Sequence, residues 1–376
     1  MKCYICHRKL TKSNTHFYYK RMCKKCGEYN WVRREELVDL RGYNALVTGG
    51  RIKIGYETAL KLLRSGAYVV VTTRFPVDAV QRYSRERDFC EWYERLKVYR
   101  IDFVQLQELF ILSEYLYNSL EHLDILINNA AQTIKHDEDY YRTLLNREKN
   151  DFERLDQTLK NLIVNNDKGK VISTSNNWLN QLVPLATLEP RDKESIKNIS
   201  FKQEDLYLYN DVQTREKNSW TKKAGEISLT ELLEVQLINN TAPFVLCTNL
   251  RSLLENSPHH YRYIINVSAM EGQFSKENKN AFHPHTNMAK ASLNMFTRTS
   301  AQDYLNSNIL MNSVDTGWIT DENPDWLRIK NEKKGLLPPL DAKDGASRLC
   351  DPIFQTITND RIIYGSFLKD YMYTEW

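Results

Sequence analysis

From residue 43 onward, short apolar runs and segments with helical spacing of apolar positions follow one another along the chain. Residues 44–48 (NALVT) form a short apolar run that predicts a buried strand, and two glycines follow. From Ile54 the apolar positions recur at helical spacing as far as Gly66, which predicts an amphipathic helix. Residues 68–73 predict a second buried strand. This strand–turn–helix–strand order predicts a βαβ unit, whose turn can place a pyrophosphate at a helix N-terminus.

Four of the seven cysteines form two hooks before this unit. Two residues separate Cys3 from Cys6, and two separate Cys23 from Cys26. Such hooks can present four thiolates to one tetrahedral Zn²⁺, so we expect a zinc site. Four thiolates fill the coordination sphere, which predicts a structural ion, and a module of about 30 residues needs that ion in order to fold. The remaining cysteines are expected to be small core residues: Cys90, Cys247 and Cys350.

Composition and charge indicate a globular protein and give no sign of a nucleic-acid-binding or membrane protein. A chain of 376 residues with 41% apolar and 27% charged residues is typical of globular proteins. The net charge of +4 is uneven, because residues 1–40 contain ten Lys or Arg and four Asp or Glu. A basic segment can attract nucleic acid or an acidic partner, but no nucleic-acid-binding motif accompanies it, so we expect a solvated surface. Without an apolar run of about 18 residues or a signal-peptide core, a cytoplasmic protein with no membrane contact is expected.

Six later segments resemble the short-chain dehydrogenase/reductase family, in that family's order. They are Asp102 after a strand-like run, residues 123–131 (LDILINNAA), Asn239 within residues 238–244, residues 263–268 (YIINVS), Lys290 within residues 288–292, and residues 312–318 (NSVDTGW). The resemblance covers about residues 41–133 and 227–376. It implies an α/β fold with one doubly wound parallel sheet of Rossmann type, and a nicotinamide dinucleotide as cofactor.

The end of the second predicted strand bears on which dinucleotide is bound. An acidic residue there would hold the ribose hydroxyls of NAD, but the first acid is Asp78. Arg74 follows the strand instead, and Arg51 adds a cation within the glycine turn. A guanidinium suits a 2′-phosphate through forked hydrogen bonds, so NADP(H) is expected in preference to NAD(H). The alternative is that Arg74 is a surface residue and the adenine ribose is weakly held.

The chain departs from the family pattern at three places. Lys53 stands where the family has a glycine in its turn, and it either crowds the phosphates or adds charge to them. The family places a phenol four residues before its lysine, so that the lysine lowers the phenol's pKa, but here Thr286 precedes Lys290. The family's pair of serines reads Ser268-Ala269, so Ser268 supplies the hydroxyl only if the alignment slips by one.

Two pairs of residues are candidates for a replacement acid. His283 and His285 stand just before Thr286, and the pKa of histidine suits proton transfer. Tyr140 and Tyr141 follow the Asn-Asn-Ala-Ala segment and can reach the site from an inserted region. The alternative for each is a surface or packed side chain without chemistry. Lys290 can also hold only the nicotinamide ribose, a role that needs no acid.

Residues 134–228 stand where the family passes soon from a strand to its next helix. This polar segment predicts a helix over 151–164, a strand over 170–174 and a loop-rich stretch over 192–218. An insertion here emerges at the carboxyl edge of the sheet, where ligands bind. We expect either a substrate lid or partner surface, or an elaboration without chemistry.

The domain organisation expected from these segments has three parts. Residues 1–30 form the zinc-binding module, 31–42 a linker, and 43–376 one dinucleotide-binding domain that carries the insertion. The sequence leaves open self-association and a protein partner for the module or the insertion.

The preferred function is an NADP(H)-dependent oxidoreductase that moves a hydride between nicotinamide and a small carbonyl or alcohol substrate. The cofactor-binding residues are expected to be Gly49, Arg51, Gly55, Arg74, Asp102, Asn129 and Lys290. The catalytic positions are expected to be Lys290, Ser268, Thr286 and Asn239. The alternative is a catalytically degenerate dinucleotide-binding scaffold or redox sensor. In a third and weaker interpretation, the zinc module contacts nucleic acid.

Overall fold

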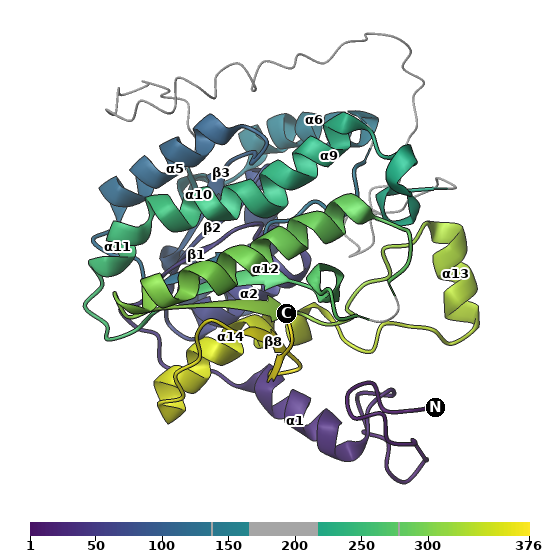
Figure 1. The fold of residues 1–376 in the computed structure, drawn as a ribbon. Helices are drawn as coiled ribbons and strands as arrows, with labels where there is room; N and C mark the ends of the chain where they lie inside the picture. Colours follow the sequence, from purple (N-terminus) through teal and green to yellow (C-terminus); the bar gives the residue numbers. More distant parts are fainter. Residues whose placement is uncertain (137, 165–216, 277–278) are drawn as a thin grey trace.

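The computed structural model describes residues 1–136, 138–164, 217–276 and 279–376. In these residues one sheet lies between layers of helices (Figure 1). The strand order is β5-β3-β2-β1-β4-β6-β7-β8-β9, and every neighbouring pair is parallel except β8 with β9. This arrangement confirms the doubly wound α/β fold that the sequence predicts.

The elements follow one another in the α/β alternation. The strands are β1 Asn44–Val47, β2 Tyr68–Thr73, β3 Leu96–Arg100, β4 Ile125–Asn128, β5 Ile163–Val164, β6 Arg262–Ser268, β7 Ile309–Asp315, β8 Phe367–Lys369 and β9 Met372–Thr374. The α-helices are α1 Lys24–Glu35, α2 Lys53–Arg64, α3 Pro76–Tyr83, α4 Phe89–Trp92, α5 Leu106–Ser119, α6 Glu138–Arg154, α7 Gln157–Leu162, α9 Leu229–Gln236, α10 Ala242–Asn249, α11 Arg251–Glu255, α12 Pro284–Leu305, α13 Asp325–Lys333 and α14 Ala342–Asn359. The short turns are the 3₁₀ helices η1 Tyr93–Arg95, η3 Ser219–Thr221, η4 Ala224–Glu226 and η6 Met270–Gly272, and the π-helical turn η5 Leu237–Thr241.

Alternate residues of the central strands pack on opposite sides of the sheet, because successive strand side chains point to opposite faces. In β1, Ala45 and Val47 join the apolar cluster formed with α2, α3 and α14. Leu46 between them joins the cluster formed with α5, α10 and α12. Both faces are therefore covered, as parallel sheets require. The strand β1 lies between β2 and β4, so the strand order reverses at this point. The connections on its two sides run to opposite sides of the sheet, and this opens a crevice at the carboxyl end of β1.

The described part of the insertion differs from the helix expected over 151–164. The helix α6 ends at Arg154, the shorter α7 follows, and β5 pairs in parallel with β3 at the sheet edge. The break lies at Asp156, whose carboxylate accepts a hydrogen bond from the Leu159 amide at 2.9 Å and so caps a new helix. The expected strand over 170–174, and the loop-rich stretch except residues 217 and 218, lie outside the described residues.

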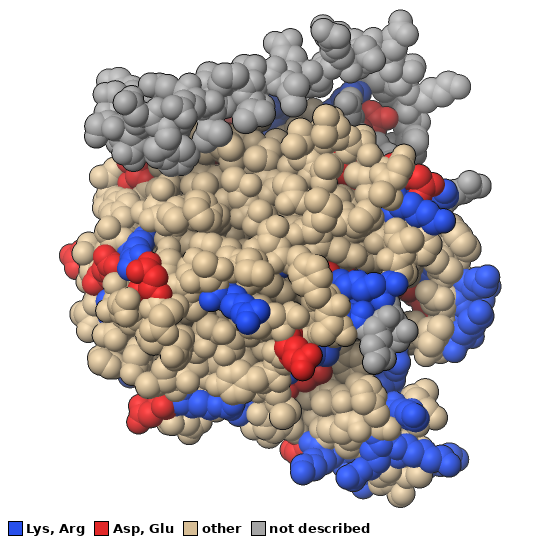
Figure 2. Space-filling model, viewed as in Figure 1, with Lys and Arg blue, Asp and Glu red and all other residues tan. Residues whose placement is uncertain are grey.

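The N-terminal segment packs against the main body near the C-terminal helix (Figure 1). A third apolar cluster joins Cys3, Tyr19, Met22 and Cys23 to Leu340. The helix α1 runs through the expected boundary at residue 30 into the predicted linker. Figure 2 shows Lys and Arg gathered over this segment, as the uneven charge predicts. Across the described ranges, no helix is both long and apolar enough to cross a bilayer.

Candidate functional site

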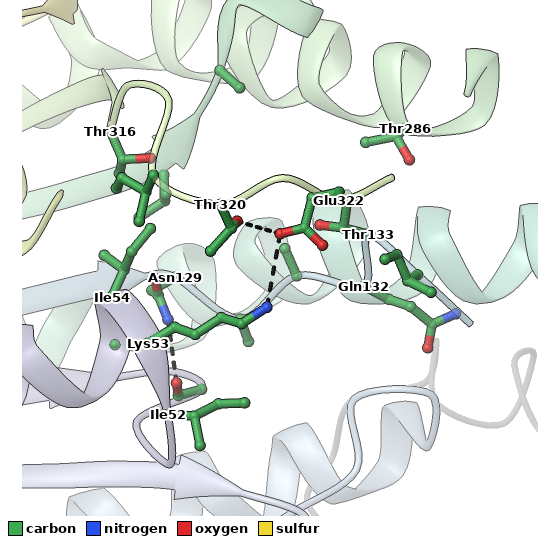
Figure 3. Close-up of a pocket in the computed structure, with 18 of the residues that line it drawn as sticks. Ile52, Lys53, Ile54, Asn129, Gln132, Thr133, Thr286, Thr316, Thr320 and Glu322 are labelled. Carbon is green, nitrogen blue, oxygen red and sulfur yellow. Dashed lines mark hydrogen bonds and ion pairs between the residues drawn. The ribbon is translucent and has the colours of Figure 1, made fainter. Parts of the chain in front are cut away.

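A cavity of about 890 Å³ opens at the carboxyl edge of the sheet. The turn after β1, the ends of β4 and β6, the N-terminal half of α12 and the loop after β7 contribute to its walls (Figure 3). The lining includes most of the cofactor and catalytic residues expected from the sequence: Gly49, Arg51, Gly55, Arg74, Asp102, Asn129, Ser268, Thr286 and Lys290. Asn239 is the one such residue that does not line it.

The glycine turn after β1 is held in a close-packed form by Asn129. Its Nδ2 donates to the carbonyl oxygens of Thr48 at 2.9 Å and Gly49 at 3.3 Å. Gly49 has φ +71°, a left-handed conformation that favours glycine. A Cβ on Gly55 would lie 2.3 Å from the Gly49 oxygen and 2.4 Å from Asn129 Nδ2. The turn therefore requires glycine at both positions, and Asn129 positions its backbone.

Lys53 adopts the backbone conformation that a glycine would take at this position, with φ +53°. Its side chain extends toward Glu322 in the loop after β7, and Nζ lies 3.7 Å from Oε1 (Figure 3). Thr320 in the same loop also hydrogen-bonds that carboxylate. Of the two alternatives, the orientation favours added charge, because the side chain extends across the cavity toward Glu322 and not over the backbone of the glycine turn.

The two arginines expected at a 2′-phosphate have different surroundings. Arg51 Nη1 lies 2.8 Å from Asp78 Oδ2 at the start of α3, so its charge is already paired. Burial would raise the pKa of Asp78, but Arg51 and Arg82 lower it. Arg74 lies over the rings of Phe75 at 5.5 Å and Tyr141 at 4.7 Å, and no ion pair of the described residues includes it. Arg74 is therefore the better cation for a phosphate.

Asp102 and Asn239 are both held by backbone contacts. Asp102 lines the cavity, and its Oδ1 accepts a hydrogen bond from the Val104 amide at 3.1 Å. Asn239 is buried in η5, a type of helical distortion that often marks functional sites. Its Oδ1 accepts from the Gln132 amide at 2.7 Å, and its Nδ2 donates to the Gln132 oxygen at 3.2 Å. Asn239 thus positions the segment after β4, which itself lines the cavity.

Lys290 lies on α12, one helical turn after Thr286, and is among the residues that line the cavity. Its side chain is buried, and Nζ donates to the Val267 oxygen at 2.6 Å. Desolvation lowers the pKa of Lys290 to about 8, although the nearby carboxylate of Glu271 opposes the shift. A lysine with this pKa can exchange a proton near neutral pH.

Two residues that line the same cavity carry buried hydroxyls. Ser268 Oγ and Thr286 Oγ1 have no hydrogen-bond partner among the described residues. Buried hydroxyls in folded proteins are usually hydrogen-bonded, so these two have unused capacity for a polar atom in the cavity. Ala269 also lines the wall but offers no such group.

The two histidines expected as replacement acids lie outside the cavity lining that includes Ser268 and Thr286. His283 stacks on Trp220 at 3.8 Å, and its Nδ1 lies 2.8 Å from the Trp220 oxygen. His285 is buried beside Glu231, with 3.6 Å between Nε2 and Oε1. Neither histidine is among the residues that line the cavity.

Tyr140 and Tyr141 line the cavity at its opposite end, near Arg74. Arg74 follows β2, whereas Ser268 ends β6, and three strand spacings separate these strands. With about 4.8 Å between neighbouring strands, the two ends are about 14 Å apart. The tyrosines therefore belong to the Arg74 end and not to the Lys290 end.

The structure also brings in cavity residues that sequence reasoning missed, among them Tyr4, Glu271 and Glu322. Tyr4 lies between the first two cysteines, far along the chain from the glycine turn. Glu271 lies just beyond the predicted strand that ends at Ser268, and this was the only signal that could have suggested it.

The four hook cysteines converge in the N-terminal segment. Their sulfur atoms all lie within 4.8 Å of one another, and Cys6 Sγ lies 3.7 Å from Cys23 Sγ. Tetrahedral zinc with bonds of about 2.3 Å needs sulfurs about 3.8 Å apart. The Cys23 amide also donates to Cys3 Sγ at 3.3 Å, as suits a thiolate. The donor set therefore fits a closed tetrahedral ion.

A second group of metal-binding residue types, among those described, is His122, Asp124 and His259 at the opposite edge of the sheet. Both histidine Nε2 atoms lie near the Gly42 oxygen, at 3.3 and 3.4 Å. The Asn44 amide donates to Asp124 at 2.6 Å. These groups have protein partners, so nothing here calls for an ion.

Comparison with known proteins gives the same assignment as the fold. The family description "short chain dehydrogenase" matches residues 43–184, and "Enoyl-(Acyl carrier protein) reductase" matches residues 210–334. An uncharacterised protein of Acanthamoeba polyphaga mimivirus is 34% identical over 370 residues, covering 94% of this chain and 71% of that protein. (+)-Neomenthol dehydrogenase of Capsicum annuum is 35% identical over 90 residues, covering 23% of this chain and 28% of that enzyme.

Solved structures share the fold at low sequence identity. A short-chain dehydrogenase from Burkholderia cenocepacia in complex with NADP has TM-score 0.54 and 16% identity, covering 88% of this chain and 96% of that one. The Pseudomonas aeruginosa RhlG/NADP complex has TM-score 0.53 and 17% identity, covering 88% and 95%. These structures show the fold, and the two family matches over residues 43–184 and 210–334 show that the chain belongs to the short-chain dehydrogenase/reductase family.

Proposed function

We propose that this protein is an NADP(H)-dependent oxidoreductase acting on a small carbonyl or alcohol substrate. One observation carries the proposal: a single cavity joins the glycine turn and Arg74 to Lys290 and two unpartnered buried hydroxyls. The end of the cavity with the glycine turn and Arg74 suits a nucleotide phosphate, and the end with Lys290 and the two hydroxyls suits a substrate oxygen. The two NADP complexes of the same fold support the choice of cofactor.

The residues that would hold the dinucleotide all line one cavity. Gly49 and Gly55 allow the pyrophosphate to approach the N-terminus of α2, Arg74 would pair with the 2′-phosphate, and Lys290 would hold the nicotinamide ribose. When bound, the nicotinamide supplies or accepts the hydride. The chain itself must then hold the substrate oxygen and move one proton.

In carbonyl reduction, Ser268 Oγ and Thr286 Oγ1 would donate hydrogen bonds to the substrate oxygen. Thr286 passes its proton to that oxygen and takes one from the Lys290 ammonium, whose lowered pKa makes it a competent donor. Alcohol oxidation runs the same transfer in reverse. Lys290 therefore takes over part of the task of the family's phenol.

The second candidate is a dinucleotide-binding scaffold without turnover. Thr286 at the phenol position favours it, because an aliphatic hydroxyl is a far weaker acid. Both candidates bind the dinucleotide and differ only in whether it reacts.

The test is NADPH oxidation with a panel of carbonyl compounds, run on the wild type, Lys290→Ala and Arg298→Ala. Arg298 is exposed on the same helix and is the matched control. Turnover by the wild type and Arg298→Ala, reduced about a hundredfold or more in Lys290→Ala, supports the oxidoreductase. Nucleotide binding without oxidation above Lys290→Ala favours the scaffold.

A structural Zn²⁺ on the four cysteines and a cytoplasmic location belong to the same proposal. The separation of the sulfurs supports the ion, and a reducing compartment keeps such cysteines available as thiolates.

A further inference from the structure

Tyr4 connects the cysteine module to the cavity. It lies between Cys3 and Cys6 in the first hook, yet its side chain is part of the cavity wall. Its amide donates to the Arg21 oxygen at 2.8 Å within the module. Its hydroxyl accepts a hydrogen bond from the Trp318 amide at 3.0 Å.

The segment that Tyr4 holds is the loop after β7, residues 316–322, which we call the β7 loop. Every residue of this loop lines the cavity, which it borders opposite the glycine turn. It bends at Gly317, where φ is +85°, and the Tyr4 hydroxyl lies 3.4 Å from the position of a Cβ there. The β7 loop also carries Glu322, the partner of Lys53. Its conformation therefore sets the shape of the proposed cofactor site.

Other residues of the module contact the same loop and the segment that follows α13. The Arg21 guanidinium lies 5.0 Å from the centre of the Trp318 ring, and its Nη1 donates to the Leu337 oxygen at 2.7 Å. Ile319 packs against the apolar cluster that Cys3 and Cys23 help to form. The module and the β7 loop thus share one small core.

Polar and charged side chains of the N-terminal segment, including α1, fix that segment to the start of α14. Arg34 Nη1 lies 2.6 Å from Asp341 and 3.0 Å from Asp344, and the Tyr19 hydroxyl also donates to Asp344. Arg348 donates to the Asn30 side chain at 2.7 Å. A module docked in this way can transmit the geometry of its metal site to its contacts.

We propose that the metal-bound first hook positions Tyr4, and that Tyr4 in turn fixes the β7 loop as a wall of the dinucleotide site. Both ends of the hook are metal ligands, so the ion restrains the two residues between them. Tyr4 is a positioning residue in this account, and metal loading sets the affinity for the cofactor. The affinity part rests on the proposed function, whereas the effect on the β7 loop does not.

The test compares full-length wild type, Tyr4→Phe and Tyr18→Phe, each loaded with zinc and checked for metal content. Tyr18→Phe is the matched control, because its hydroxyl donates to Asp341 at 3.0 Å across the same interface but lies outside the cavity wall. Hydrogen–deuterium exchange of peptides covering the β7 loop is measured first, and NADPH affinity by fluorescence titration second. A chelator-treated wild type is measured alongside.

Tyr4→Phe should keep its zinc, exchange faster at the β7 loop and bind NADPH about three- to tenfold more weakly, which corresponds to one lost hydrogen bond. Tyr18→Phe should match the wild type in both measurements, and removal of the metal should reproduce the faster exchange. Equal exchange of the β7 loop in Tyr4→Phe, Tyr18→Phe and wild type overturns the inference. If no variant binds NADPH, the proposed cofactor fails, but the exchange data still decide the role of Tyr4.

Discussion

Replacing Gly55 by alanine tests whether the glycine turn is built as the structure shows. The added Cβ would lie 2.3 Å from the Gly49 oxygen and 2.4 Å from Asn129 Nδ2, both closer than packed atoms allow. The Asn129 amide or the Gly49 peptide must therefore move. Either movement breaks the hydrogen bonds from Asn129 to the turn.

The size of the effect follows from these contacts. Two lost hydrogen bonds cost about 1 kcal/mol each, and overpacking adds about 1–3 kcal/mol. Alanine recovers about 1 kcal/mol in helix propensity within α2. We expect a loss of about 2–4 kcal/mol in the free energy of unfolding, and NADPH affinity at least about tenfold weaker because the phosphate cradle is displaced.

The assays are urea unfolding and fluorescence titration with NADPH. Gly225→Ala is the matched control, since a Cβ there meets nothing within 4 Å. Its unfolding free energy should stay within about 0.5 kcal/mol of the wild type. If Gly55→Ala behaves like Gly225→Ala in both assays, the described packing of the turn is wrong.

Three further predictions concern charge and metal. Lys53→Met should weaken NADPH binding about fivefold and Glu322→Gln should strengthen it, since one charge at 4 Å is worth about 1 kcal/mol. If titrations show the same change in NADPH affinity for both variants, or no change for either, this prediction is wrong. The pKa of Lys290 is lowered from 10.5 to about 8 in the folded state, so the unfolded chain binds more protons between these pH values and the free energy of unfolding should rise with pH across that window. Urea unfolding of Lys290→Met should lack this rise, and an identical rise in the variant would show that Lys290 does not have the lowered pKa. Elemental analysis should find about one zinc per chain, lost in Cys23→Ser and kept in Cys90→Ser, and a zinc-free wild type purified without chelator rules the site out.

The sequence predicted the elements whose signals are local. The apolar run of β2 and the glycines of the first turn have the residue pattern of a βαβ unit, and the structure places them so. The spacing of the cysteines likewise predicted their convergence, which the cluster of sulfurs confirms. In each case neighbouring residues carry the whole signal.

The differences between Arg51 and Arg74 could not be predicted in this way. Both are arginines beside the turn, but α3 brings Asp78 to only one of them. The same holds for Tyr4, because contact with the β7 loop depends on how α1 docks on α14. These contacts depend on how segments distant in sequence pack together, and the local sequence pattern does not predict that packing.

The roles at the Lys290 end remain predictions, although the structure narrows the choice. Ser268, Thr286 and Lys290 share the cavity wall, whereas His283 and His285 pack into the protein around the start of α12. His283 precedes α12 and His285 lies in its first turn, and neither lines the cavity, which their proximity to Thr286 in the chain did not reveal.

Equilibrium titration of the full-length protein with NADPH and with NADH tests the central claim most directly. The account predicts one NADPH per chain, bound at least about tenfold more tightly than NADH, because Arg74 can pair with the 2′-phosphate. Failure of both nucleotides to bind would contradict the account at its foundation.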